Sequence, residues 1–270
     1  MSYHPDSPFR IIPGEAFDLS ARPTEVDAYS DKSAAKAAAR EDAEAIADLA
    51  HRLYGEADRK LLIVLQGMDT SGKDGTTKAL FRHTPPLNVG VAAFKKPSKE
   101  ELAHDFLWRV HQRVPGAGQI TVFNRSHYED VLVVKVREFA DARTVEQRYA
   151  QINDFERLLA ESGTTVLKFM LHISPEVQAE RLRARLEEPD KRWKFNPGDL
   201  DDRALWPAFM EAYETAVSRC STAHAPWYVI PSDKKKTRNA IIARLVRRTL
   251  EAMDPAYPDP GYRPGDFDIA

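Results

Sequence analysis

The sequence predicts an α/β fold in which helices flank a parallel five-stranded sheet. Short apolar segments rich in branched residues recur along the chain and alternate with helical segments, as buried parallel strands do. A glycine-rich segment follows the first of these strands directly and leads into a helix, which is the setting of a phosphate-binding loop. With 270 residues, the chain is long enough to bury one substantial core with a lid or an arm.

The first strand is predicted at residues 60–66, and the helix after the loop begins near residue 76. Glycines allow the backbone to approach an anion closely, and the amides at the helix N-terminus supply donors and partial positive charge. The lysine of the loop adds a cation that can follow a phosphoryl group during transfer. We expect the phosphate-binding residues to be Gly67, Met68, Asp69, Thr70, Ser71, Gly72, Lys73, Asp74 and Gly75.

The loop departs from the usual phosphate-loop pattern at one position. Asp74 occupies the place at which Ser or Thr offers a hydroxyl to Mg²⁺, and Asp69 adds a second carboxylate within the loop. Carboxylates beside phosphate oxygens repel them unless a metal ion lies between. The competing interpretation is a chance glycine-rich turn, which the flanking strand and helix argue against.

The chain before the loop divides into two parts. Residues 1–30 are rich in Pro, Asp and Ser and are predicted to form an extended arm, available for contact with a neighbouring subunit. Residues 31–54 show a helical apolar pattern that we expect Gly55 to end, and this helix is interpreted as scaffold. The kinase-type domain is predicted to span 31–253, followed by an irregular tail at 254–270.

A second strand at residues 89–94 runs into Lys95 and Lys96. Open α/β sheets bind ligands at the carboxyl ends of their strands, so these lysines are candidate phosphate ligands. A solvated turn is the alternative interpretation. Ser98 and Glu101 form a capping-box pattern that predicts a helix over 99–112.

The third strand, at residues 120–123, ends in Asn124 and Arg125 and leads into an apolar helix through residue 136. A carboxylate or amide at such a strand end can hold Mg²⁺, and an arginine can hold a phosphoryl group as a planar charged fork. Nucleotide monophosphate kinases carry Asp-Arg at this point. His127 and Tyr128 are interpreted as local helix-start residues.

The next predicted elements are a helix at 144–162 and a fourth strand at 164–173. Another helix follows, with Ser174 as its N-cap and Pro175 at its first position. Arg181 and Arg185 lie one turn apart on that helix. The following residues are rich in cations, aromatics and proline, and they include Lys191 and Lys194. We predict a lid at about 181–198 that brings these cations over the transferred group, against the alternative of an exposed, salt-bridged surface.

The remaining chain predicts a helix at 199–223, a fifth strand at 227–230 and a closing helix at 239–253. The net charge of −2 gives no indication of nucleic-acid binding, and no apolar run is long enough to cross a membrane. No signal peptide is visible, and the single Cys220 fits a reducing cytoplasm and a packing role. We therefore expect a cytoplasmic protein.

Three motifs in order resemble the polyphosphate kinase type 2 family. They are GMDTSGKDG at 67–75, FNRSHYEDVL at 123–132 and WKFNPGDL at 193–200, and the likeness extends over about residues 30–250. The resemblance implies a thymidylate-kinase-like P-loop fold with a helical lid, and phosphoryl transfer between inorganic polyphosphate and nucleotides. It also implies Mg²⁺ as cofactor, with Mn²⁺ as a substitute.

Carried onto this sequence, the resemblance implies that Asp69 and Asn124 hold the metal and that Lys73 and Arg125 hold the phosphoryl group. It also implies that four lid residues close over the nucleotide phosphates and the polyphosphate chain. These residues are Arg181, Arg185, Lys191 and Lys194. Asn124 departs from members with Asp at this position and resembles the subgroup that accepts both nucleoside mono- and diphosphates. The role of Asp74 is left open.

The predicted reaction is reversible transfer from polyphosphate to AMP and ADP, giving ADP and ATP, in a protein expected to be a homo-oligomer. Two other functions stay open from the sequence. One is an ATP-dependent nucleotide or metabolite kinase of the same fold, and the other is a non-catalytic polyphosphate-binding module. The concentration of acids and cations at one predicted site argues against the second.

Overall fold

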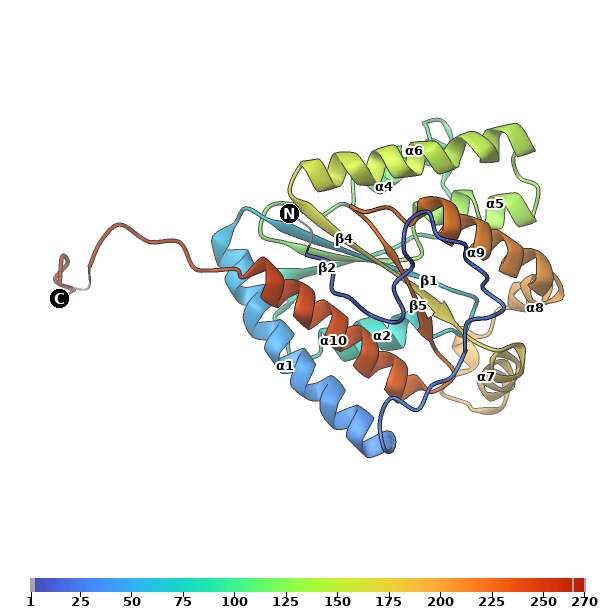
Figure 1. The fold of residues 1–270 in the computed structure, drawn as a ribbon, viewed down its shortest axis with the longest axis horizontal. Helices are drawn as coiled ribbons and strands as arrows, with labels where there is room; N and C mark the ends of the chain where they lie inside the picture. The colour runs from blue at the N-terminus through green and yellow to red at the C-terminus, as the bar shows by residue number, and fades with distance from the viewer. Residues whose placement is uncertain (1–2, 264, 270) are drawn as a thin grey trace.

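The protein was analysed as a computed structural model that describes residues 3–263 and 265–269. Five parallel strands form one sheet, as the sequence predicted, and the structure gives their order as β2-β3-β1-β4-β5 (Figure 1). The central position of β1 places the loop that follows it at the middle of the sheet's carboxyl edge. The strands are β1 Lys60–Gln66, β2 Val89–Ala93, β3 Ile120–Asn124, β4 Thr164–His172 and β5 Trp227–Pro231.

Alternating side chains of β1 enter cores on opposite faces of the sheet. Leu62 and Val64 pack in the core that α6 Ala142–Glu161 and α9 Trp206–Cys220 cover. Leu61 and Ile63 pack in the core that α1 Lys32–Glu56, α2 Lys73–Leu80 and α10 Lys235–Met253 cover. Figure 1 shows these helical layers above and below the strands. Burial on both faces explains why the strand segment is almost wholly apolar.

Several predicted helices are shorter or more broken than their patterns indicated. The helix predicted at 99–112 is two short helices, because the Asp105 carboxylate accepts from the amides of Leu107 and Trp108 and starts a new turn. The capping box at Ser98 is present as predicted. The segments that replace single predicted helices are α3 Lys99–Leu102, α4 Trp108–His111, η2 His127–Asp130, α5 Val133–Val136 and α8 Gly198–Ala204.

The first helix does not end at Gly55 as predicted. It continues to Glu56, and Ala57 takes the left-handed conformation at its C-cap, with φ of +55°. Gly55 instead meets the tail, since a Cβ at this position would lie 2.8 Å from the ring of Tyr257. Glycine at position 55 therefore allows the tail to approach the helix closely, and it does not mark the end of the helix.

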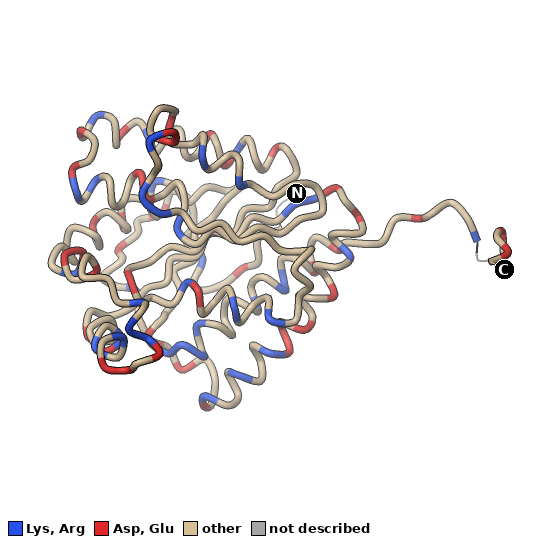
Figure 2. The backbone as a smooth tube through the Cα atoms, turned by 180° about the vertical axis from the view of Figure 1, so that it is seen from behind, with Lys and Arg blue, Asp and Glu red and all other residues tan. Residues whose placement is uncertain are grey.

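Helix α7 Pro175–Glu187 begins with the predicted serine cap and proline. After it, the chain is irregular apart from the short η3 Arg192–Lys194, and η1 Pro86–Asn88 is a similar single turn before β2. No helix in residues 3–263 and 265–269 combines the length and apolarity that crossing a bilayer requires. Lys and Arg are interspersed with Asp and Glu over most of the backbone (Figure 2).

The N-terminal arm runs across its own chain beside β5. The amide of Ile11 donates to the carbonyl of Trp227 at 2.8 Å, and that of Val229 donates to the carbonyl of Phe9 at 2.9 Å. Ile11 and Leu19 are buried in the core. The arm therefore covers an edge strand that would otherwise present unpaired backbone groups. Contact between the arm and a neighbouring subunit stays a prediction.

A fully buried ionic cluster connects three layers of the fold. The Lys168 ammonium of β4 donates to Glu156 at 2.5 Å, to the Tyr128 hydroxyl at 2.7 Å and to the Cys220 carbonyl at 2.7 Å. His127 contacts the same glutamate at 3.1 Å. His127 and Tyr128 do begin a helical turn, η2, as the sequence predicted, but their side chains are buried in this long-range network instead of forming local hydrogen bonds.

We predict that Glu156→Gln lowers the free energy of unfolding by about 3 kcal/mol or more, because it leaves a buried ammonium without its counter-charge. Chemical denaturation of the parent and the variant measures this difference. Glu161→Gln on the same helix is the control, since its partner Arg157 is exposed and the change should have no measurable effect. Equal stability of the parent and Glu156→Gln would show that the ammonium is neutral or finds another partner.

Candidate active site

The carboxyl ends of β1 and β3 bring the predicted loop and the Asn124-Arg125 pair together. The Arg125 guanidinium donates to the Asp69 carboxylate at 2.6 Å. The Asn124 amide nitrogen donates to the Asp74 carboxylate at 2.5 Å. These residues are 50 or more positions apart in the sequence, and the parallel pairing of β1 with β3 places them side by side. The two sequence motifs therefore form one site.

Lys73 lies under the loop, where its ammonium donates to the carbonyls of Gly67 at 2.7 Å and of Met68 at 3.3 Å. Burial, together with the positive charge of Arg125, lowers the pKa of Lys73 to about 8. Gly72 takes φ of +106°, a conformation that glycine adopts without strain. An internal lysine thus holds the loop by its carbonyls, and an anion brought to the loop would stabilise the charged lysine.

Arg125 is held in an unusual backbone conformation. Its φ is +61°, in the left-handed region, and its amide donates to the carbonyl of Leu65 at 3.1 Å. Its guanidinium also donates to Glu129 at 3.2 Å, and this glutamate and Asp69 raise the pKa of Arg125. Glu129 was not among the predicted site residues. Its spacing of four residues from Arg125 on a short turn is the signal that could have identified it.

Two buried arginines hold the outer side of the loop by its carbonyl groups. Arg181 donates to the carbonyls of Thr70 at 3.0 Å and Ser71 at 3.4 Å, and it also reaches two carbonyls after β5, those of Ser232 and Asp233. Arg238 of α10 donates to the Ser71 carbonyl at 2.6 Å. Arg181 was predicted as a lid cation, and here its guanidinium ties α7 to the loop.

Arg238 was missed by the sequence reasoning. Burial and the charge of Arg181 lower the pKa of Arg238 to about 9, and a Cβ at Gly72 would lie 2.0 Å from its guanidinium. The signal was available in the run of cations from Lys234 to Arg238. A helix N-terminus carries partial positive charge, so cations there are unfavourable unless an acceptor or an anion is close.

The other predicted lid cations contact groups outside the phosphate loop. Arg185 forms an ion pair with Asp199 at 2.9 Å, and burial, together with the charge of Asp69, raises the pKa of Asp199 to about 6. Lys191 pairs with Glu188, and the Lys194 ammonium lies 4.9 Å from the centre of the Trp193 ring. Apart from Arg181, the lid is therefore tied mainly to itself and to Asp199.

Lys95 and Lys96 are exposed just beyond the carboxyl end of β2. The carbonyl of Lys95 accepts from Arg109 at 2.8 Å, and the described residues provide no carboxylate partner for either ammonium. Because β2 lies next to β3, both lysines are on the same sheet edge as the phosphate loop. Their side chains can move toward an anion at this edge, while their direct contact with phosphate stays a prediction.

The residues proposed to hold a metal have the donor atoms that Mg²⁺ requires. Asp69 and Asp74 offer carboxylate oxygens, and Asn124 uses its amide nitrogen toward Asp74, which leaves its amide oxygen for a cation. Within the described part of the chain, no three His, Cys, Asp or Glu side chains form a ready metal cluster. This incomplete oxygen set fits a Mg²⁺ ion that takes its other ligands from water and substrate phosphates.

This combination of a phosphate loop, a buried lysine and convergent arginines and carboxylates on a parallel sheet defines a P-loop phosphotransferase site. The sequence matches the profile of Polyphosphate kinase 2 (PPK2) over residues 29–258. The chain belongs to the polyphosphate kinase 2 family.

Relatives cover nearly the whole chain. It is 46% identical over 254 residues to the AMP/ADP-polyphosphate phosphotransferase of Meiothermus ruber, covering 93% of this chain and 95% of the relative. It is 37% identical to the ADP-polyphosphate phosphotransferase of Rhodopseudomonas palustris, covering 93% and 91% of the two chains. A crystal structure of Polyphosphate Kinase 2 from Arthrobacter aurescens TC1 superposes with a TM-score of 0.90 at 40% identity, covering 97% and 92%.

We predict different effects for the two lid arginines. Arg181→Ala removes a buried guanidinium that donates hydrogen bonds to four carbonyls. The variant should therefore have a free energy of unfolding lower by about 1.5–3 kcal/mol. Arg185→Ala, which breaks a partly exposed ion pair, should change stability little. Thermal and denaturant unfolding compare the two variants. Equal stabilities would contradict the structural role of Arg181.

Proposed function

We propose that this protein transfers phosphoryl groups from inorganic polyphosphate to AMP and ADP, giving ADP and ATP, and that it also runs in reverse. The convergence of Lys73, Arg125 and Asp69 at one sheet edge is the observation that carries this proposal. Support for these substrates comes from the relatives named for AMP/ADP and ADP phosphotransfer from polyphosphate.

The transfer needs no general base in the proposed mechanism. The terminal phosphate of AMP or ADP is already ionised, and one of its oxygens attacks the end phosphorus of polyphosphate. A new P–O bond forms to that phosphorus as its bond to the bridging oxygen breaks, and the shortened chain leaves with the negative charge. The protein's contribution is to position the acceptor phosphate and the end of polyphosphate in line and to neutralise the developing charge.

Each cation has a defined place in this mechanism. The loop amides and Lys73 hold the end of polyphosphate, which raises the pKa of Lys73 by bringing negative charge to it. Arg125, already fixed by Asp69 and Glu129, orients its guanidinium toward the transferred group. Substrate phosphates compete with Asp199 for Arg185, which lets the lid close with Lys191 and Lys194. Lys95 and Lys96 hold the acceptor phosphates at the edge of the sheet.

We infer that Asp69 and Asn124 hold Mg²⁺, with Mn²⁺ as a substitute. The metal would supply charge neutralisation between the phosphate oxygens and the loop carboxylates. Asp74, which accepts from Asn124, would orient that amide so that its oxygen faces the cation. This arrangement offers a role for the acid that replaces the usual Ser or Thr of the loop.

We further propose that the protein acts in the cytoplasm as a homo-oligomer without nucleic-acid partners. Its single cysteine is buried and forms no disulfide, which suits a reducing compartment. Equilibrium sedimentation measures the subunit number directly.

The proposed function is tested by incubating AMP or ADP with polyphosphate and Mg²⁺ in the absence of ATP. The parent should form ADP from AMP and ATP from ADP, and Lys73→Ala should lower turnover about 100- to 1,000-fold while remaining folded. Arg157→Ala, an exposed change on α6, is the control. If product forms only in a parallel reaction with ATP as donor, the protein is an ATP-dependent kinase. If it binds polyphosphate without turnover, it is a binding module.

We predict that Asn124 sets the range of acceptors. An aspartate there would add a charge next to Asp74 and the metal, where such changes are worth on the order of a few kcal/mol. Asn124→Asp should therefore change the ratio of the AMP and ADP rates, since the two acceptors place their reacting phosphates differently. Initial rates with each acceptor measure the ratio. An unchanged ratio would contradict this role, whatever the effect on overall activity.

A further inference from the structure

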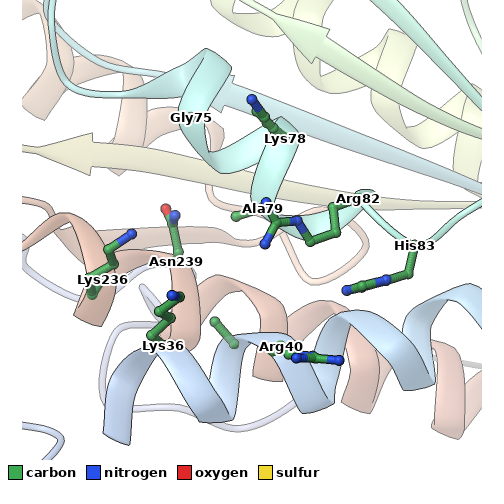
Figure 3. A pocket seen from close by; sticks show the side chains of 10 residues that line it. Lys36, Arg40, Gly75, Lys78, Ala79, Arg82, His83, Lys236 and Asn239 are labelled. Carbon is green, nitrogen blue, oxygen red and sulfur yellow. The ribbon is translucent and has the colours of Figure 1, made fainter. Parts of the chain in front are cut away.

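A cationic groove lies beside the phosphate loop, between α1, α2 and α10. Its volume is about 540 Å³, within the range of small-molecule sites. Lys36 of α1 and Lys236 of α10 extend into the space between these helices, and Arg82 lies just beyond the end of α2 (Figure 3). The residues that line the groove are Lys36, Ala39, Arg40, Gly75, Lys78, Ala79, Arg82, His83, Lys236 and Asn239.

The charge of the groove is unusual for a protein whose net charge is −2. Its lining contains five lysines and arginines and one histidine, and no aspartate or glutamate. Arg40 pairs with Glu44 at 2.8 Å, but the described residues provide no carboxylate partner for Lys36, Lys78, Arg82 or Lys236. A concave surface lined by one sign of charge concentrates ions of the opposite sign.

The groove begins at the phosphate loop itself. Gly75 belongs to the loop motif and lines the groove, Lys78 follows it three residues later on α2, and Arg82 lies two residues beyond the end of that helix. The five residues from Gly75 to the end of α2 at Leu80 correspond to roughly 7–8 Å of helix, and Arg82 extends the row of cations beyond it. On the opposite side, Asn239 accepts from Arg238, whose guanidinium also holds the Ser71 carbonyl of the loop.

The N-terminus of α10 adds a second electrostatic observation. Lys235, Lys236 and Arg238 occupy its first turns, where the helix dipole already carries partial positive charge. Lys234 is balanced by Glu25 and Asp27 of the arm, but no such acids face Lys236 in the groove. An anion in the groove would relieve repulsion that the described residues leave uncompensated.

We propose that this groove binds the distal phosphates of the polyphosphate chain whose end lies in the phosphate loop. This inference rests on the proposed function and adds a donor subsite outside the reacting centre. A linear polyanion suits a groove of spaced cations whose lining contains no acid and no apolar side chain larger than alanine. A long chain occupies the loop and the groove together, whereas a short donor occupies only the loop. The groove therefore favours long donors through KM rather than through kcat.

The test compares sodium tripolyphosphate with a long-chain sodium polyphosphate as donors to ADP. In the variant Lys36→Ala/Arg82→Ala/Lys236→Ala, KM for the long chain should rise about tenfold or more, because charged hydrogen bonds are lost. KM for tripolyphosphate and ADP and kcat should stay near the parent values. The control Arg52→Ala/Arg113→Ala/Arg143→Ala changes the net charge equally at exposed positions outside the groove and should behave as the parent.

An unchanged KM for the long chain would overturn the proposal, as would an equal rise for both donors. A rise confined to the KM for ADP would assign the groove to the nucleotide and would also overturn it. Equilibrium binding of long-chain polyphosphate without nucleotide, measured over a range of salt concentrations, gives a readout independent of turnover. The groove variant should show a shallower dependence of affinity on salt than the parent and the control.

The binding measurement separates the two proposals. A parent that binds long chains through the groove but transfers no phosphoryl group would refute the proposed function alone. A parent that turns over polyphosphate, with a groove variant that binds and reacts as the parent does, would refute the groove alone.

Discussion

The structure depends on how the backbone of the phosphate loop is held. Its amides must face an anion, so its carbonyls need donors on the other side. Lys73 supplies them from below, and Arg181 and Arg238 supply them from outside, both of them reaching the Ser71 carbonyl. These donors come from α2, α7 and α10, which makes the loop the point at which α7, the helix that enters the predicted lid, and the closing helix α10 meet.

Holding a loop with cations has an electrostatic consequence. Lys73 and Arg238 are buried, and desolvation, together with the charge of a neighbouring arginine, lowers the pKa of each group. Asp69 and Glu129 balance part of this charge through Arg125. The remaining positive potential is suited to a highly charged donor and acceptor. The same reasoning connects the active site to the groove, where cations continue along α2 and α10 without acids among the lining residues.

The ionic cluster between Lys168 of β4 and Glu156 of α6 has a different physical character. Glu156 and Lys168 are fully buried and satisfy each other, so they carry little net potential to the surface. Their contacts with His127 and Tyr128 fix the turn that follows Arg125. The left-handed backbone of Arg125 is thus supported from inside the protein, as strained residues at functional sites require. Arg125, at the candidate active site, and the core are therefore coupled through one turn.

The sequence by itself determined the five strands, the phosphate loop and the family, because apolar runs, glycine spacing and three ordered motifs are local signals. The family resemblance also implied that Asp69 and Asn124, which follow β1 and end β3, hold the same metal. Tertiary structure decided what local patterns do not encode. Arg181 could be placed on its helix but not assigned to loop carbonyls, and His127 could not be recognised as buried against Glu156. Such contacts join residues far apart in the chain, so only the packed fold specifies which charges are compensated and which are left for a ligand.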